Sequence, residues 1–196
     1  MLGKRRRRAI DTKPHKATRE QDRRVQSVEN TPRHFAPPVD DALFREAMSR
    51  VAASVHVIAT DGPAGLAGMT ATAVQSVSDA PPTLLCCLNM KSRTRAVLQA
   101  NGAFSVNVLA ADQEDASEIF AGRRGLEGAG RFAPLDFART GSGQPALSGA
   151  LAVFDCHIAE AEAIGSHLVV FGHVKAITLG TPGPALVYRG RAYHGL

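Results

Sequence analysis

Residues 65–89 read GLAGMTATAVQSVSDAPPTLLCCLN and carry the main clue to the fold. The first part of this stretch has small and hydroxyl-bearing side chains, and the last part is a dense apolar run after Pro81 and Pro82. A strand that only had to pack would carry larger side chains, because β-branched and aromatic residues pack best on a pleated surface. The small residues indicate that something approaches the backbone closely, and tight packing between strands is the alternative explanation.

Strand patterns surround this stretch on both sides. Residues 54–60 (SVHVIAT) alternate and are rich in β-branched residues, and the turn DGPAG at 61–65 predicts a hairpin with the opening stretch. Further strands are expected over TLLCCLN, AFSVNVL, ALAVFDCHIAEAEAI, HLVVFGHVKAITL and ALVYRGRAYHGL. Short helices are expected after Asp40 and Asp41, over 91–100 and over 112–122. Strands with only short helices between them favour an antiparallel β-barrel with helices packed outside.

The segment 122–149 carries seven glycines and little periodicity. We therefore predict a long surface loop or lid there.

The basic character of the chain lies in its N-terminal segment. Residues 1–36 hold 11 Lys and Arg against 4 Asp and Glu, whereas the remaining residues hold 12 against 14. This segment has few core-forming residues, so we predict a disordered basic tail over 1–36 and one folded domain over 37–196. A nucleic-acid-binding body would carry a basic footprint on the fold itself, so a nucleic-acid partner is not expected, and binding through the basic tail is the alternative. No apolar run is long enough to cross a bilayer, so a membrane partner is not expected either.

The three cysteines, Cys86, Cys87 and Cys156, do not have the spacing of a zinc site. We interpret them as small buried hydrophobes in a reducing compartment. Charged residues follow Met1, where a secretory signal peptide would continue into an apolar segment. We therefore predict a cytoplasmic location.

Two segments have features that together suit a flavin. The small side chains of Thr70–Val74 allow a flat ring to approach backbone N–H and C=O groups. About 20 residues later, NMKSRT (89–94) offers hydroxyls, cations and free N–H groups at a predicted helix start, which suit a phosphate. A ring edge on a strand and a phosphate at a helix start describe flavin mononucleotide, FMN.

Several longer pieces make the chain resemble a known family. FREAMSRVAASVHVIATDGPAGLAGMTATAVQSVSDAPPTLLCCLN, SVNVL, DCHI, GSHLVVFGHV and YRGRAYHGL occur in the order of the flavin-reductase-like family, over roughly residues 40–196. Members of this family are small reductase components that supply reduced flavin to partner monooxygenases. The chain looks most similar to the branch of NADH:FMN reductases in pyrimidine utilisation, and the reductases of 4-hydroxyphenylacetate 3-monooxygenase are similar too.

The resemblance implies a mainly β fold, a split β-barrel of the FMN-binding type with short peripheral helices, which forms a homodimer with the flavin near the subunit interface. It implies an NADH-dependent FMN reductase that supplies a monooxygenase in pyrimidine or aromatic-compound catabolism, with FAD and NADPH as alternatives and no metal. The ring would lie against Thr70, Ala71, Thr72, Ala73 and Val74, and the ribityl chain and phosphate near Ser76, Asn89, Ser92 and Thr94. A non-enzymatic flavin- or haem-binding protein is the alternative function.

His167 and His173 lie six residues apart on one predicted strand and so on the same face. Their spacing allows a metal pair, but no carboxylate or third ligand joins them in sequence. The resemblance makes His167 the candidate catalytic residue beside the flavin or nicotinamide, and a polar residue satisfied by the backbone is the alternative. Tyr188, Arg189 and Arg191 are candidates for the nicotinamide site, with a solvated rim as the alternative for the arginines.

Overall fold

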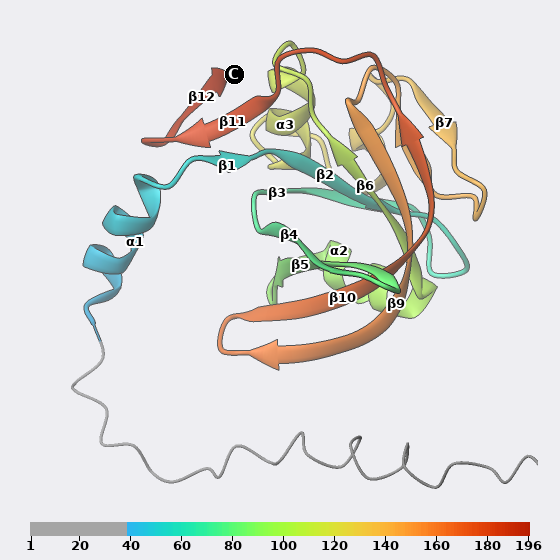
Figure 1. The fold of residues 1–196 in the computed structure, drawn as a ribbon, viewed down its shortest axis with the longest axis horizontal. Coiled ribbons are helices and arrows are strands. Elements are labelled where there is room, and N and C mark those ends of the chain that lie inside the picture. The colour runs from blue at the N-terminus through green and yellow to red at the C-terminus, as the bar shows by residue number, and fades with distance from the viewer. Residues whose placement is uncertain (1–38) are drawn as a thin grey trace, which may run out of the picture. The chain divides into compact units, whose positions relative to one another are not determined.

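One antiparallel sheet of seven strands dominates the structure (Figure 1). The computed structural model describes residues 39–196, so the tail predicted over 1–36 lies outside the described residues. The sheet has the strand order β3-β2-β6-β9-β10-β5-β4. Its strands are β2 (His56–Thr60), β3 (Ala67–Ala71), β4 (Val74–Asp79), β5 (Pro82–Asn89), β6 (Ala103–Val108), β9 (Ala152–Ile164) and β10 (His167–Leu179).

The sheet closes on itself at Thr72 and Ala73. Strands β3 and β4 form the two edges of the sheet, yet only these two residues separate them along the chain. An extended chain spans at most about 3.5 Å per residue, so the two edges must lie close together. The carbonyl of Ala73 also accepts a hydrogen bond from the Cys87 amide at 3.0 Å, which ties this corner to β5. The sheet is therefore the predicted antiparallel barrel.

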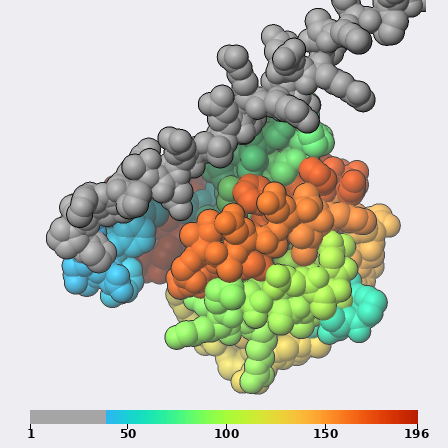
Figure 2. Space-filling model, turned by 90° about the horizontal axis from the view of Figure 1, so that it is seen from below, coloured from blue at the N-terminus to red at the C-terminus, as the bar shows by residue number. Residues whose placement is uncertain are grey.

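A buried cluster fills the inside of the barrel. It joins Ile58 of β2 and Phe104 of β6 to Val170 of β10 and Leu84 of β5, two pairs of neighbouring strands that β9 separates in the sheet order. Helix α2 (Arg93–Asn101) contributes the fully buried Leu98 to the same cluster. Figure 2 shows the yellow-green segment around α2 at the surface beside the orange hairpin of β9 and β10.

Two of the three cysteines belong to this interior. Cys86 and Cys156 are buried in the cluster, and Cys87 of the same strand as Cys86 is half-buried. Burial raises the pKa of Cys86 and raises that of Cys156 to about 12, so both thiols stay protonated. They lie as expected for small buried hydrophobes.

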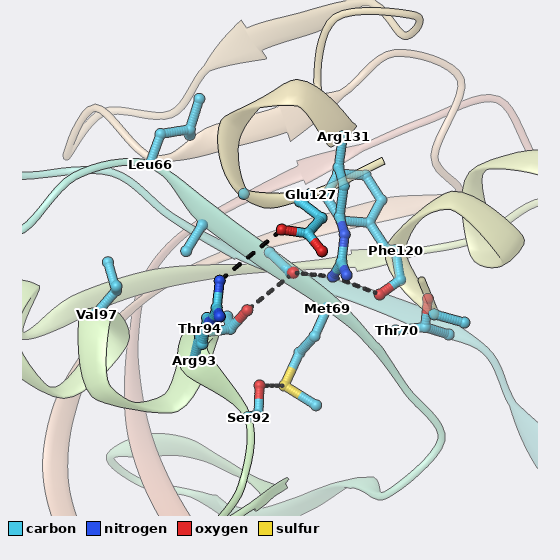
Figure 3. A pocket seen from close by; sticks show the side chains of 14 residues that line it. Leu66, Met69, Thr70, Ser92, Arg93, Thr94, Val97, Phe120, Glu127 and Arg131 are labelled. Atoms are coloured by element: carbon cyan, nitrogen blue, oxygen red, sulfur yellow. Dashed lines mark hydrogen bonds and ion pairs between the residues drawn. The ribbon is translucent and has the colours of Figure 1, made fainter. Parts of the chain in front are cut away.

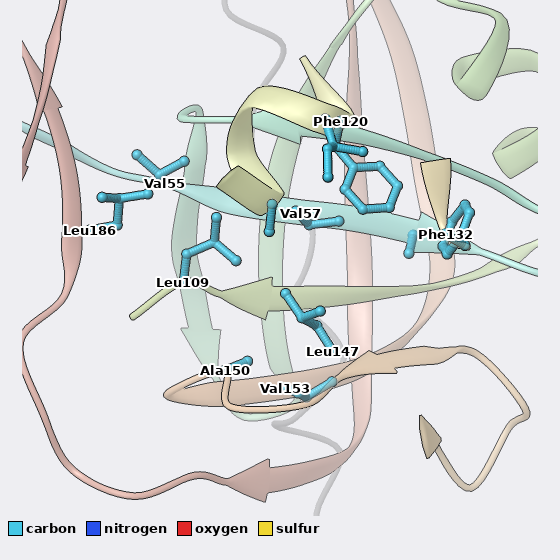
Figure 4. Packing of buried hydrophobic residues seen from close by; sticks show 12 residues of the cluster. Val55, Val57, Leu109, Phe120, Phe132, Leu147, Ala150, Val153 and Leu186 are labelled. Carbon is cyan, nitrogen blue, oxygen red and sulfur yellow. The ribbon is translucent and has the colours of Figure 1, made fainter. Parts of the chain in front are cut away.

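A second buried cluster covers the outer face of β2 (Figure 4). Val57 and Ala59 point into it, whereas Ile58 points into the barrel, so every residue of β2 is buried. Helix α3 (Glu114–Phe120), a 3-10 helix (Gly128–Arg131) and the hairpin of β7 (Phe137–Arg139) and β8 (Pro145–Leu147) pack on this side.

The prediction of a long surface loop or lid over 122–149 is therefore wrong in part. Phe132 and Leu147 are buried, and the Phe132 ring centroid lies 4.8 Å from that of Phe120 and 5.0 Å from that of Phe137. These apolar residues pack the segment against the rest of the protein. The sequence gives no sign of this, because they are isolated among glycines and form no periodic pattern.

A small sheet and an N-terminal helix complete the described chain. The sheet orders β1 (Ala53–Ser54), β11 (Leu186–Arg189) and β12 (Ala192–Gly195), so the expected single strand ALVYRGRAYHGL is two strands with a turn at Gly190. Helix α1 (Asp41–Ser49) is capped by Asp40, whose side chain accepts hydrogen bonds from two backbone amides. None of its residues is buried. No helix in the described range combines the length and apolarity needed to cross a membrane.

Candidate active site

Three adjoining hollows follow strand β3 and the corner after it. We call them the α2 hollow, the corner hollow and the α1 hollow, with volumes of about 520, 210 and 800 Å³. Thr70 lines both the α2 hollow and the corner hollow, and Thr72 lines both the corner hollow and the α1 hollow. The hollows therefore adjoin one another along the segment with the small side chains, and we call this row of hollows the groove.

The α2 hollow ends at an uncapped helix start (Figure 3). Ser92 stands at the N-cap of α2, but its side chain makes no capping hydrogen bond. Its hydroxyl reaches only the Met69 sulfur, at 3.7 Å, and thioether sulfur is a weak acceptor. The first N–H groups of α2 and the Ser92 hydroxyl are thus available to a ligand, and together with Arg93 they suit an anion.

Thr94 and Arg131 have other partners within the same hollow. Thr94 is buried and donates its hydroxyl proton to the Gly68 carbonyl at 3.0 Å. Arg131 donates to the carbonyls of Leu126 and Phe120 at 3.0 and 3.2 Å, so it fastens the 3-10 helix beside the groove. Since the Thr94 proton is already donated, the predicted contact with a phosphate is left to Ser92.

Arg93 and Glu127 face each other at the hollow that they both line (Figure 3). Arg93 Nη1 lies 3.9 Å from Glu127 Oε2, and both side chains are almost fully exposed. Such an exposed ion pair contributes little stability, so a bound anion can replace Glu127 as the partner of Arg93 at small cost.

The corner hollow combines small residues with a polar and aromatic rim. Its lining includes Thr70 and Thr72 of the small-residue segment together with Arg123, Tyr188 and Tyr193. The Thr70 hydroxyl donates to the Ser117 carbonyl at 2.6 Å, and the Ser117 hydroxyl donates to Tyr193 Oη at 2.8 Å. The ring centroids of Tyr188 and Tyr193 lie 5.1 Å apart.

The α1 hollow has a largely apolar wall. Phe44 and Met48 of α1, Val74 of β4 and Leu85 of β5 line it. His56 lines it too, is only 7% exposed, and has no hydrogen-bond partner for its Nδ1 atom. Burial lowers the pKa of His56, so a neutral imidazole with an unpaired nitrogen adjoins the groove.

The structure brings together most of the predicted site residues. Thr70, Ala71, Thr72, Ala73, Val74, Ser92 and Thr94 all line the groove. Ser76, Asn89 and His167 line none of the three hollows. Asn89 instead shapes the turn before α2, because its Oδ1 accepts from the Lys91 amide at 2.9 Å.

The two histidines of β10 lie near strand β5. His167 is exposed, aligns with Asn89 across the β5–β10 pair, and places Nδ1 2.9 Å from the Ser166 hydroxyl. His173 places Nδ1 3.2 Å from the Thr83 hydroxyl, which agrees with a polar strand residue that has a local partner.

Gly68 shows that packing explains part of the small-residue stretch. A Cβ atom at Gly68 would lie 2.6 Å from Phe120 Cε1 and 3.0 Å from Phe132 Cζ. A larger side chain is therefore excluded there by the protein itself, whereas Thr70–Ala73 border the open groove.

Sequence reasoning missed Arg123, Arg131, Phe120 and Tyr193 as groove residues. They follow Thr70 by 50 or more residues and reach the groove only through tertiary packing. No pattern in the single sequence marks them.

Comparison with known proteins shows which family has this fold. The model of the flavin reductase like domain matches residues 48–196. The chain belongs to this family. The flavin reductase is 49% identical over 161 residues to "FMN reductase (NADH) RutF 1" of a Methylorubrum extorquens strain, covering 82% of this chain and 79% of the relative. It is 45% identical over 166 residues to "FMN reductase (NADH) RutF" of Stutzerimonas stutzeri, covering 85% and 94%.

A solved structure agrees with the fold of this flavin reductase. BorF, the flavin reductase component of a bacterial two-component tryptophan halogenase, has a TM-score of 0.75 and 32% sequence identity. The match covers 80% of this chain and 98% of BorF.

Proposed function

We propose that this flavin reductase oxidises NADH, reduces free FMN and releases the reduced flavin to a partner monooxygenase. One observation carries the proposal: adjoining hollows connect an uncapped helix start to a segment with small side chains. The relatives named as NADH-dependent FMN reductases support FMN and NADH as the substrates. FAD and NADPH remain the alternatives.

The residues of the groove fit FMN. The Ser92 hydroxyl, the free N–H groups of α2 and the Arg93 guanidinium would hold the phosphate. The backbone from Thr70 to Val74 would border the edge of the ring, and Gly68 and the Phe120 ring would border the ribityl chain between ring and phosphate.

The hydride chemistry belongs to the flavin and the nicotinamide, and FMN supplies the electron acceptor. The chain contributes orientation, because a hydride transfer between two aligned rings needs position more than an acid or base. Binding through backbone groups and a few hydroxyls suits a flavin that has to leave after each turnover. His167 stays a prediction as a catalytic residue, and its exposed place on β10 gives it no support within one chain.

A homodimer is part of the proposal. The side chains of Leu43, Phe44 and Met48 on α1 are 50–61% exposed and lie on one short helix. A second copy of the chain that covers these side chains would also cover the α1 hollow, which Phe44 and Met48 line. The buried and half-buried thiols agree with a reducing, cytoplasmic setting, and pyrimidine or aromatic-compound catabolism remains the predicted pathway.

Steady-state kinetics test the function. Purified protein should oxidise NADH only when free flavin is added, with FMN a better acceptor than FAD and NADH a better donor than NADPH. Binding of FMN without any NADH oxidation would instead support the non-enzymatic flavin-binding alternative.

A further inference from the structure

We infer that Arg123 stabilises the negative charge that the FMN ring acquires on reduction, and that the corner hollow holds the pyrimidine end of the ring. The inference rests on the proposed function and assigns a role to a residue that follows α3. Arg123 lines the corner hollow together with Thr70 and Thr72, the residues that would border the ring.

The contacts of Arg123 hold its charge at the rim of this hollow. Its Nη1 lies 2.6 Å from Glu118 Oε1, and its side chain is 53% exposed. Hydrogen bonding to Tyr188, and then to Glu118, raises the pKa of Arg123. Burial raises the pKa of Tyr193, so this hydroxyl stays neutral and Arg123 supplies the positive charge among the residues lining the hollow.

The polarity of the groove gives the ring a direction. The corner hollow offers a guanidinium and the hydroxyls of Thr70 and Tyr193, which match the carbonyl and N–H groups of a pyrimidine. On the other side of Thr72, the α1 hollow has Arg45 and Arg191 in its lining, and each lies beside a carboxylate of α1, Asp41 at 4.0 Å and Glu46 at 2.9 Å. Its wall also offers Phe44 and Leu85, which match a dimethylbenzene ring. A ring laid across Thr72 therefore has its polar end beside Arg123.

The charge balance of the reaction explains why a cation there matters. A C–H bond of NADH breaks, an N–H bond forms at N5 of FMN, and the electron pair moves with the hydride. NADH becomes NAD⁺, and the neutral ring becomes an anion with its charge over N1 and the C2 carbonyl. A guanidinium near this end favours the reduced ring over the oxidised ring.

Glu118 gives a second prediction of opposite sign, because its carboxylate partly neutralises the charge of Arg123. Glu118 is not among the residues that line the corner hollow, so the cation lies nearer the ring than its counter-ion. Removal of the Glu118 charge should therefore strengthen the preference for reduced FMN, and removal of the Arg123 charge should weaken it. A purely structural role of this ion pair predicts the same direction for both changes.

Binding of oxidised and reduced FMN to the full-length protein tests the inference. Dissociation constants are measured anaerobically by fluorescence and absorbance titration, with the flavin reduced by dithionite and not by NADH. Arg123→Gln should weaken the binding of reduced FMN about tenfold relative to the binding of oxidised FMN. The attraction between two unit charges near a protein surface is large enough to produce a change of this size. The potential of the bound two-electron couple should then fall by about 30 mV.

Arg124→Gln is the matched control. Arg124 pairs with Asp115 at 2.7 Å and is also 53% exposed, but it lines none of the three hollows. It should leave the ratio of the two dissociation constants within about twofold of wild type. Arg123→Lys should keep most of the preference, and Glu118→Gln should raise it.

The outcomes separate the inference from the proposed function. Wild-type protein that binds neither form of FMN would contradict the proposed function. If wild-type protein binds both forms and folded Arg123→Gln keeps the same ratio of the two dissociation constants, the inference is overturned and the proposed function is not. The inference would also be overturned by equal effects of Arg123→Gln and Arg124→Gln on this ratio, or by a weaker preference for reduced FMN in Glu118→Gln.

Discussion

His56 belongs both to the buried strand β2 and to the lining of the groove. Its imidazole is buried beside the corner of the barrel, lines the α1 hollow, and leaves Nδ1 without a partner. Burial lowers its pKa below the usual value of about 6.5. A proton on this ring would introduce a charge in a place that offers no carboxylate partner among its contacts in the described chain.

This shift predicts a pH dependence of stability. Between the lowered pKa and about 6.5, the unfolded chain binds more protons at this histidine than the folded chain, so the free energy of unfolding falls as the pH falls. Urea unfolding of the flavin-free protein at about pH 7.5, 6.5 and 5.5 should show this loss. His56→Gln should remove part of the slope, and His157→Gln, a change at an exposed histidine, should not. Identical slopes in wild type and His56→Gln would contradict the assignment.

At the scale of elements, the packing of α3 and the 3-10 helix on β3 depends on Gly68. The rings of Phe120 and Phe132 occupy the space that a side chain at this position would need. The same contact places Phe120 and Arg131 beside the groove, so packing and site geometry are linked here.

Gly68→Ala should therefore lower the free energy of unfolding by about 1–3 kcal/mol, the usual cost of overpacking. Gly130→Ala is the control, because nothing lies within 4 Å of a Cβ at Gly130. Denaturant unfolding measures both changes, and equal stabilities of the two variants would show that the Phe120 ring moves aside freely.

The elements that could be predicted are those with a local pattern. Alternating β-branched residues predicted β2, and the turn after it predicted the pairing with β3. The hairpin of β7 and β8 was missed, because its core residues are isolated apolar positions among glycines. The split of the last strand into β11 and β12 depends on a turn with positive φ at Gly190 and Arg191, which the sequence did not mark clearly.

The same limit applies to the candidate site. Thr70–Val74 and Ser92 could be found because composition, spacing and family resemblance all point to them. Arg123 and Tyr193 could not, since only the packing of α3 and β12 against β3 brings them to the corner hollow. The hydrogen bond from Thr94 to the Gly68 carbonyl, which uses the Thr94 hydroxyl proton, has no signal in the sequence either.

At the scale of the whole molecule, the exposed apolar side chains of α1 predict association of two chains. Phe44→Ser with Met48→Ser should weaken the dimer at least about tenfold, or about 1.4 kcal/mol, because truncated apolar side chains at an interface centre commonly cost this much. Sedimentation velocity over a range of concentrations measures the shift. Leu179→Ser, which removes an apolar side chain 79% exposed at the end of β10, is the control. A monomeric wild-type protein with full FMN reductase activity would contradict the prediction.

The central claim is that one groove holds FMN with its phosphate at the start of α2, and the affinities for FMN and riboflavin test it most directly. Riboflavin has the ring and the ribityl chain but no phosphate. Hydrogen bonds to a charged group contribute roughly 1.5–3 kcal/mol each, so Ser92→Ala and Arg93→Gln should each weaken FMN binding about tenfold or more and leave riboflavin binding nearly unchanged.

Arg95→Gln is the matched control, because Arg95 lies on the same helix, bonds to Gln99 at 2.7 Å and does not line the α2 hollow. Fluorescence titration of both ligands against wild type and the three variants is the measurement. The account predicts that wild type prefers FMN to riboflavin at least about tenfold and that Ser92→Ala and Arg93→Gln lose this preference, whereas Arg95→Gln keeps it. Equal affinities of wild type for FMN and riboflavin, or equal losses for the two ligands in Ser92→Ala, would contradict it.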